Sequence, residues 1–220
     1  MLDADLHTRL LSLSTPMLAD ARVRLGLPEN HLDPGIRPVI PFSRMAGCAM
    51  TVELESAAPG VYDDLAPLLE AYARPGVVFP IMVISIPPES HHRGIFGEGA
   101  ANFARQGGYQ GVLVEGGVRD THELRDLDFP TFSRTICCGY IMGKVAVKSV
   151  GEPVSIGGRT IAMGDVLLAD NDGVMVLGQP ELTPVLDKAL AIQQWEQEFL
   201  EQVAAGKTPS EAQDLVGAMP

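Results

Sequence analysis

Two stretches, VVFPIMVISI at residues 77–86 and FGEGAANFARQGGYQGVLVEGGVRD at residues 96–120, decide the fold class. Residues 77–86 form an almost continuous apolar run, which is typical of a strand buried on both faces. Residues 96–106 are helix-like, a glycine pair ends this helix, and residues 111–115 form a second short apolar strand. Two such strands joined through a helix predict a βαβ unit, so we expect an α/β fold with a parallel sheet.

Two helices are predicted at the N-terminus. Residues 3–13 carry apolar side chains at helical spacing, and Thr15 followed by Pro16 predicts an N-cap with proline at the first helical position. This second helix should run to about Leu25. Prolines and glycines crowd residues 26–41, which therefore predict a loop with one short strand at most.

A further strand and helix precede the apolar run. Residues 46–55 alternate and contain β-branched side chains, which predicts a strand, and residues 61–73 carry apolar side chains at helical intervals. Together with the apolar run at residues 77–86, this strand and helix form a first βαβ unit. After the second unit, the glycine pair at residues 116–117 predicts a turn, and a brief helix capped by Thr121 is expected through Leu127.

The second half of the chain is rich in short strands and glycine turns. Residues 157–158 and 171–173 suit tight reversals between antiparallel strands. A long helix over residues 181–204 and a short helix after Thr208 end the chain. We therefore expect an added β-layer beside the α/β part. The strands are expected at residues 131–136, 144–150, 153–156, 165–169 and 174–177.

The length and composition fit one soluble domain over residues 1–220. A chain of 220 residues with 46% hydrophobic content can bury a full core, and no linker or repeat divides it. Its apolar runs fall short of the roughly 20 residues that a membrane span needs, so no membrane partner is expected. The first 13 residues mix acidic and basic side chains and resemble neither a secretion signal nor a transit peptide. We therefore expect a cytoplasmic protein.

Charge and cysteine content exclude further classes. The net charge is −12 and the 16 basic residues are spread singly, which is the wrong electrostatic field for a phosphate backbone, so we expect no nucleic-acid partner. Cys48, Cys137 and Cys138 are too few for a disulfide framework or a structural zinc site. The adjacent pair Cys137 and Cys138 suits either a redox element or ordinary buried thiols.

Residues 97–120 hold the residue types that suggest chemistry. Gly97, Glu98, Gly99 and Ala100 lie at the start of the helix predicted at residues 96–106. Free backbone N–H groups at a helix N-terminus favour an anion. Residues 119–120, Arg and Asp, follow the next strand. In a parallel sheet both loops open at the same carboxyl-end edge, where α/β proteins bind their ligands.

These residue types suit a 2-oxo acid. Asp120 offers hard oxygens for Mg²⁺ or Mn²⁺, Glu98 offers a second carboxylate, and Arg119 offers a planar fork for a carboxylate or enolate oxygen. The same residues also fit a plain turn with a surface ion pair. Spacing alone favours that structural interpretation.

The run GVLVEGGVRDTHELRDLDFPTFSR at residues 111–134 resembles the signature of the RraA-like family. That family contains 4-hydroxy-4-methyl-2-oxoglutarate and 4-carboxy-4-hydroxy-2-oxoadipate aldolases and also the regulator of RNase E activity. The resemblance covers nearly the full chain, because STPMLADA at 14–21, FSRMAGCAMTV at 42–52 and VSIGGRTIAMGDVLLADNDGVMVL at 154–177 are also similar to it. In its aldolases twenty residues separate an acidic residue from an Arg-Asp pair, as they separate Glu98 from Arg119 and Asp120 here.

The resemblance implies a fold, a site and an activity. It implies a swivelling β/β/α domain with N-terminal helices and a long C-terminal helix, assembled as a homotrimer or homohexamer with the site between subunits. Asp120 would be the metal ligand, Arg119 the catalytic substrate clamp, and Gly97, Glu98, Gly99 and Ala100 the substrate-binding turn. Glu98 would also be catalytic, mainly through metal-bound water. A glutamate of a neighbouring C-terminal helix would complete the site, with Glu196 or Glu198 as the candidate.

The expected reaction is metal-dependent cleavage of a 4-hydroxy-2-oxo dicarboxylic or tricarboxylic acid to pyruvate, with oxaloacetate decarboxylation as a side activity. Metal and Arg119 would stabilise the pyruvate enolate, while a metal-linked water or Glu98 accepts the C4 hydroxyl proton. The alternative is a regulator that binds a ribonuclease without turnover. Residues 87–94, with His91 and His92, and residues 135–143 depart from the family pattern, so the substrate stays open.

Overall fold

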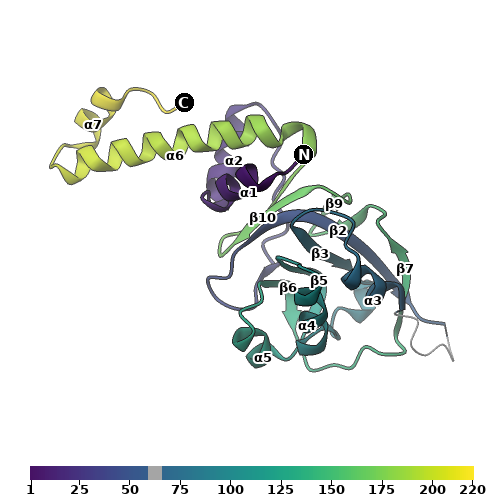
Figure 1. The fold of residues 1–220 in the computed structure, drawn as a ribbon. Helices are drawn as coiled ribbons and strands as arrows, with labels where there is room; N and C mark the ends of the chain where they lie inside the picture. The colour runs from purple at the N-terminus through teal and green to yellow at the C-terminus, as the bar shows by residue number, and fades with distance from the viewer. Residues whose placement is uncertain (59–65) are drawn as a thin grey trace.

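A computed structural model describes residues 1–58 and 66–220 (Figure 1). Its centre is a parallel block of β2 (Met45–Ser56), β3 (Pro80–Ser85), β5 (Gly111–Val118) and β6 (Thr131–Ile136), side by side in the order β6-β5-β3-β2. Almost every residue of β3 and β5 is buried, as expected for strands covered on both faces. The predicted α/β class is therefore confirmed.

Antiparallel strands extend this block on both sides. β10 (Val166–Asp170) pairs with the first part of β2 and with β11 (Gly173–Leu177), while β7 (Val145–Val150) pairs with the last part of β2. β1 (Arg37–Pro38) lies antiparallel to β6, and β4 (Gly94–Phe96) lies parallel to the end of β5. These are the nine strands that the described residues place in the main sheet.

The sheet is nearly closed on itself. Leu32 donates its backbone N–H to Val174 in β11, and five residues later the same segment enters β1 and pairs with β6. The segment thus links the two outer edges of the sheet. Leu113, Phe132, Leu167 and Val176 fill the enclosed face, which the hairpin of β8 (Val154–Ile156) and β9 (Arg159–Ile161) covers.

Helices cover the outer face in two groups. α3 (Ala66–Ala73), α4 (Glu98–Gln106) and α5 (Thr121–Asp126) pack on the parallel block through Leu68, Ala101 and Leu124. α1 (Ala4–Leu11), α2 (Thr15–Arg24) and the first half of α6 (Leu182–Ala204) pack on β10 and β11. None of the described helices is both long and apolar enough to span a membrane.

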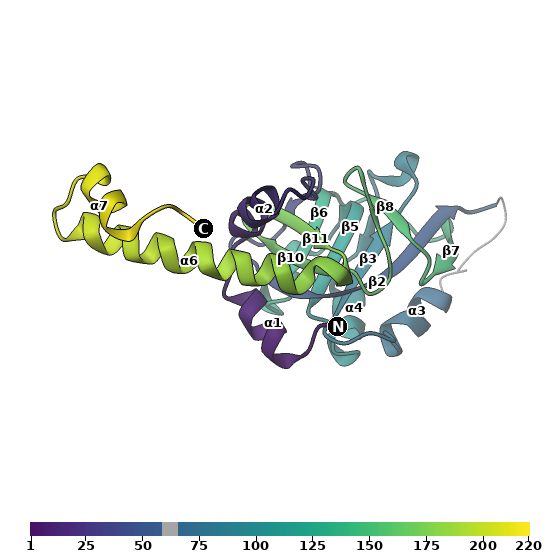
Figure 2. The same cartoon turned by 90° about the horizontal axis from the view of Figure 1, so that it is seen from above.

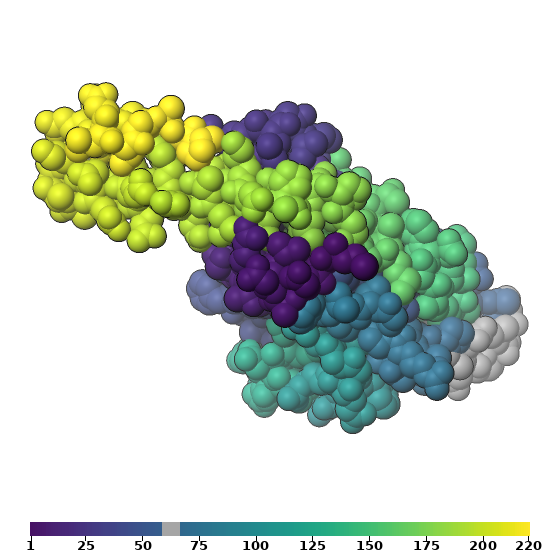
Figure 3. All heavy atoms as spheres, turned by 45° about the horizontal axis from the view of Figure 1, so that its top comes forward, coloured from purple at the N-terminus to yellow at the C-terminus, as the bar shows by residue number. Residues whose placement is uncertain are grey.

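The second half of α6 extends away from the body and carries α7 (Pro209–Val216), which folds back along it (Figures 1 and 2). The indole Nε1 of Trp195 donates to the carbonyl of Gly217 at 3.1 Å and fixes this return. Figure 3 shows the pair as an arm that stands clear of the rest of the molecule. We call the outer half of α6 together with α7 the C-terminal arm.

Most predicted elements are confirmed, with four corrections. The pair Gly116 and Gly117 is not a turn, because β5 continues through it to Val118. A Cβ on Gly116 would lie 2.2 Å from Ile86 Cδ1, and one on Gly117 would lie 2.4 Å from the Arg93 carbonyl oxygen. Glycine therefore serves close packing here, and the backbone stays extended.

The other corrections concern caps and short strands. Ser14 and not Thr15 is the N-cap of α2, because the Ser14 side chain accepts from the backbone N–H of Met17. The Thr15 hydroxyl donates instead to Asp170 at 2.6 Å. Thr121 is the first residue of α5, and Asp120 occupies the cap position before it. The strands β4 and β9 were not expected. Residues 61–65 of the helix predicted at 61–73 lie outside the described residues, and the rest is α3.

Candidate active site

The parallel pairing of β4 with β5 brings the candidate residues together. Gly94 pairs with Gly117 and Phe96 with Val118, so the two strands end side by side. The Arg119 backbone N–H donates to the Phe96 carbonyl at 2.9 Å. Shortly beyond these ends, β4 leads into α4 at Glu98 and β5 leads into α5 at Thr121. The N-terminus of α4 therefore faces the Arg119–Asp120 segment at the carboxyl edge of the sheet, as predicted.

Asp120 has an unusual backbone. Its φ is +55°, in the left-handed region that few non-glycine residues adopt, although aspartate tolerates it better than most. In this conformation its Oδ2 lies 3.2 Å from the backbone nitrogen of Glu98 and accepts that N–H. Asp120 thus caps the first turn of α4 across the strand boundary. A strained conformation of this kind is frequent at functional sites.

Arg119 lies beside that carboxylate. Its Nε is 3.7 Å from Asp120 Oδ2, and the two side chains are 40% and 39% exposed. A guanidinium has five N–H donors, so this single long contact leaves donors for a ligand. An exposed pair at this distance contributes little to stability, on the order of 0 to 1 kcal/mol. The pair therefore adds little to the stability of the fold.

Two glycines allow this arrangement. A Cβ on Gly97 would lie 2.3 Å from Asp120 Oδ2, and a Cβ on Gly94 would lie 3.1 Å from three carbons of the Arg119 side chain. Gly97 has φ −163°, which any residue can adopt, so its requirement is purely steric. Gly94 was missed at the sequence level, because a lone glycine gives no sign of what approaches it.

A cavity of about 230 Å³ opens beside these residues. Gly97, Gly99, Ala100, Arg119 and Asp120 all line it, so five of the six predicted site residues meet there. Its other walls are largely apolar and come from α3, β4, α4 and the segment after β6. Those wall residues are Leu68, Leu69, Tyr72, Gly94, Ile95, Phe103, Ile141 and Met142.

Glu98 is the exception among the predicted residues. Its side chain is exposed, and the residues described as lining the cavity do not include it. What it contributes directly is its backbone N–H to Asp120. Gly99 and Ala100 follow in the first helical turn, whose N–H groups have no acceptors within the helix. Both residues line the cavity, so this end of the helix is suited to an anionic ligand.

The donor set fits a magnesium-like ion held loosely. Within residues 1–58 and 66–220, no three His, Cys, Asp or Glu side chains gather closely enough to cage a metal. Mg²⁺ does not need such a cage, because it often keeps several waters and binds one or two carboxylates together with an anionic ligand. The half-exposed Asp120 carboxylate at the cavity mouth meets that requirement.

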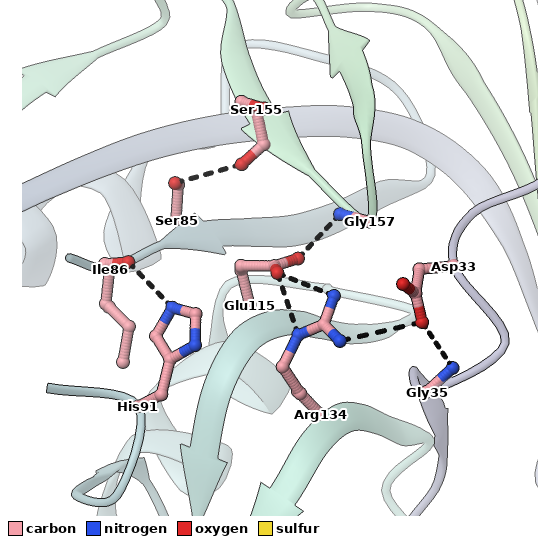
Figure 4. Close-up of polar contacts among 9 residues, drawn as sticks. All are labelled: Asp33, Gly35, Ser85, Ile86, His91, Glu115, Arg134, Ser155 and Gly157. Atoms are coloured by element: carbon pink, nitrogen blue, oxygen red, sulfur yellow. Dashed lines mark hydrogen bonds and ion pairs between the residues drawn. The ribbon is translucent and has the colours of Figure 1, made fainter. Parts of the chain in front are cut away.

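A polar network supports the strand that ends at the site (Figure 4). Glu115 in β5 accepts from Arg134 at 2.8 Å and from the backbone N–H of Gly157 at 2.6 Å. Arg134 also lies 3.5 Å from Asp33. The network lies on the enclosed face, so it fixes β5, β6 and the β8–β9 hairpin to one another.

The histidines and cysteines that depart from the family pattern do not join the Arg119–Asp120 centre. His91 Nε2 lies 3.1 Å from the Ile86 carbonyl oxygen, and His92 is exposed. A Cβ on Gly117 would lie 2.5 Å from Cys137 Sγ, which places that thiol against β5. Cys138 is exposed.

Glu196 and Glu198 lie on α6, whose outer half extends away from the body (Figure 1). Glu198 accepts a hydrogen bond from Gln194 at 2.9 Å, one turn earlier in the same helix. The described lining of the cavity beside Arg119 and Asp120 includes no residue of α6. Neither glutamate therefore belongs to the site of its own chain.

Comparisons with known proteins agree with this architecture. The chain is 30% identical over 190 residues to a Halalkalibacterium halodurans protein provisionally named a 4-hydroxy-4-methyl-2-oxoglutarate aldolase, covering 85% of this chain and 83% of that one. It is 34% identical over 89 residues to the Thermus thermophilus 4-hydroxy-4-methyl-2-oxoglutarate aldolase, covering 39% and 52%. Against protein DlpA of Legionella pneumophila it is 33% identical over 124 residues, which span 54% of this chain but only 20% of DlpA.

Solved structures show the same fold. A Pseudomonas syringae protein superposes with a TM-score of 0.80 at 26% identity, covering 96% of this chain and 98% of that one. Streptomyces coelicolor RraAS2, described as an unusual member of the RNase ES inhibitor RraA family, gives 0.77 at 23% identity, covering 90% and 97%. Residues 15–176 match the family described as Aldolase/RraA. This chain therefore belongs to the RraA-like family and has its fold.

Proposed function

We propose that this protein is a divalent-metal-dependent lyase that cleaves 4-hydroxy-2-oxo acids and releases pyruvate. The observation that carries the proposal is the placement of the Arg119 guanidinium and the Asp120 carboxylate together beside the N-terminus of α4, at the mouth of a cavity. The names of the aldolase relatives support the same activity. Because a structural relative is described as a member of a ribonuclease-inhibitor family, the names of relatives do not decide the activity. The proposed reaction therefore depends on the residues of the site.

Each residue has a proposed task. The Gly99 and Ala100 N–H groups bind the C1 carboxylate, because the first turn of a helix attracts anions. Asp120 would hold Mg²⁺ or Mn²⁺, and a bound divalent cation supplies a Lewis acid that polarises the C2 carbonyl. Arg119 donates to the C2 oxygen, where negative charge grows as the C3–C4 bond breaks.

Proton transfer completes the cleavage. The C4 hydroxyl must lose its proton as the C3–C4 bond breaks, and Glu98, whose side chain lies outside the cavity, would accept that proton through an intervening water. The electrons of that bond form the enolate of pyruvate, which takes a proton at C3 before release. Decarboxylation of oxaloacetate passes through the same enolate and is therefore proposed as a side activity.

We propose a homotrimer or homohexamer with the site between subunits. The C-terminal arm extends from the body with Leu200 and Leu215 both 61% exposed, which suits contact with another copy. Glu196 or Glu198 would then approach a neighbour's site. Light scattering tests this directly, because a mass of 23.5 kDa would mean a monomer and contradict it.

Pyruvate release tests the proposed reaction. Purified protein with Mg²⁺ or Mn²⁺ should release pyruvate from 4-hydroxy-2-oxo acids and from oxaloacetate, measured by coupled oxidation of NADH with lactate dehydrogenase. Protein-free reactions correct for spontaneous decay. Release from none of these acids, together with tight binding to a ribonuclease, would favour the regulator alternative. We also propose a cytoplasmic location, which fractionation of the source cells tests separately.

A further inference from the structure

The cavity beside Arg119 and Asp120 continues into a second hollow. The second hollow has a volume of about 310 Å³, lies between α3 and α4, and shares Leu69, Tyr72 and Phe103 with the first. We call the two together the α3–α4 groove. An apolar cavity of about 150 Å³ is enough to hold benzene, so the groove has room for a sizeable substituent.

The described residues of the groove carry little charge. Among the described residues that line either hollow, Arg119 is the one cation and Asp120 the one anion. Residues 59–65, which precede α3, contain no lysine or arginine in their sequence. If Arg119 binds the head of the substrate, the described groove has no cation left for a second carboxylate. The net charge of −12 adds no attraction for one.

Tyr72 lies where the two hollows meet. It is 2% exposed, and its hydroxyl has no hydrogen-bond partner among the described residues. Burial raises the pKa of this hydroxyl, so the side chain stays neutral and brings no charge to the groove. The hydroxyl oxygen itself is buried below the groove surface, so it is not a donor that a carboxylate in the groove can reach.

We infer that the α3–α4 groove is the subsite for the substituent at C4, and that it prefers an uncharged, apolar group to a carboxylate. The inference rests on the proposed function and narrows its substrate class. It departs from the dicarboxylic and tricarboxylic acids that the family resemblance implies. Burial of apolar carbon favours binding by about fourfold per methylene, whereas a carboxylate in the groove would lose water without gaining a partner.

A matched pair of substrates tests the inference. 4-Hydroxy-2-oxo-4-phenylbutanoate and 4-hydroxy-2-oxoglutarate share the reacting head and differ in the C4 substituent. We expect kcat/KM for the phenyl compound to exceed that for the dicarboxylate by about tenfold or more. Equal values, or a preference for the dicarboxylate, would overturn the inference.

The variant Phe103→Arg separates the groove from the intrinsic reactivity of the two compounds. Phe103 is 51% exposed at the junction of the hollows, so an arginine can enter without a cavity being left in the core. It should lower the phenyl-to-carboxylate ratio of kcat/KM by about tenfold or more. Val23→Arg on α2 makes the same charge change at 58% exposure and should leave the ratio as it is.

Two further measurements complete the design. If Phe103→Arg lowers the assembly mass seen by light scattering, the groove is covered by another subunit and the inference is wrong. An unchanged mass with a shifted ratio supports it. Deuterium exchange at C3 of pyruvate, followed by NMR in the unaltered protein, needs no C4 substituent. Its absence together with no cleavage would refute the proposed function, whereas exchange with the wrong preference refutes only the groove.

Discussion

Arg119 and Asp120 are neighbours in the chain and in space, yet their ion pair is long and half-exposed. Such a pair adds about 1 kcal/mol at most to the free energy of unfolding. The proposed role of Arg119 lies instead in the growing charge on the C2 oxygen, where a planar fork sets the geometry. Lysine keeps the positive charge but not the fork, so the two residues are not interchangeable there.

Arg119→Lys should therefore lower kcat for both aldol cleavage and oxaloacetate decarboxylation. Loss of one oxyanion donor typically costs about 10² to 10³ in kcat, on the order of 3 to 4 kcal/mol. Steady-state rates on both substrates measure the effect, and a thermal melt should stay near that of the wild type. An early melt would mean that Arg119 is a structural partner of Asp120, and near-normal kcat in a folded variant would refute its catalytic role.

At this scale the sequence predicted where the candidate residues lie better than the contacts that they make. Arg119, Asp120 and the turn at Gly97 could be found because they follow strands that end at one edge. The position of the Glu98 side chain outside the cavity could not, because a helix N-terminus in a sequence does not show which way its first side chain points. The αL backbone of Asp120 was equally hidden, since it depends on the contact with α4.

The junction of β4 with α4 is the element that positions the site. Gly97 directly follows β4, is the N-cap of α4 and leaves room for the Asp120 carboxylate. Gly97→Ala would place a Cβ 2.3 Å from Asp120 Oδ2, a distance that real structures do not tolerate. The carboxylate must then move.

We expect Gly97→Ala to lower kcat/KM by about 10²-fold, because a displacement of about 1 Å at a catalytic group can cost that much. Overpacking should also lower the free energy of unfolding by about 1 to 3 kcal/mol, measured by urea denaturation. Gly178→Ala is the matched control, since its Cβ would make ordinary contact with Pro180 at 3.7 Å. Full activity in a folded Gly97→Ala protein would show that the position of Asp120 is unimportant.

Elements with a strong apolar pattern could be predicted, and elements defined by pairing could not. β6 was predicted with its observed ends, and α6 began within one residue of the expected start. β4 has three residues and exists because β5 runs past the end of β3 and offers it a partner. The extended course of Gly116 and Gly117 follows from the packing of Ile86 and Arg93 against them, which a glycine pair in a sequence does not reveal.

The molecule as a whole combines a nearly closed sheet with an extended arm. The sheet closes through the segment from Leu32 to β1, a contact between distant parts of the chain that local patterns could not predict. The α/β class, the β-rich second half and the long last helix were predictable, because each depends on periodicity within one segment. The proposed reaction joins these parts, since the sheet edge supplies Arg119 and Asp120 and the arm provides a surface for assembly.

The most direct test of the central claim is the dependence of pyruvate release on a divalent cation. Protein treated exhaustively with EDTA and dialysed should release no pyruvate from oxaloacetate or a 4-hydroxy-2-oxo acid above the protein-free rate. Addition of Mg²⁺ or Mn²⁺ should restore release in the wild type but not in Asp120→Asn, which lacks the carboxylate proposed to hold the ion. Full release by the stripped protein, or restoration in Asp120→Asn equal to that of the wild type, would contradict the account.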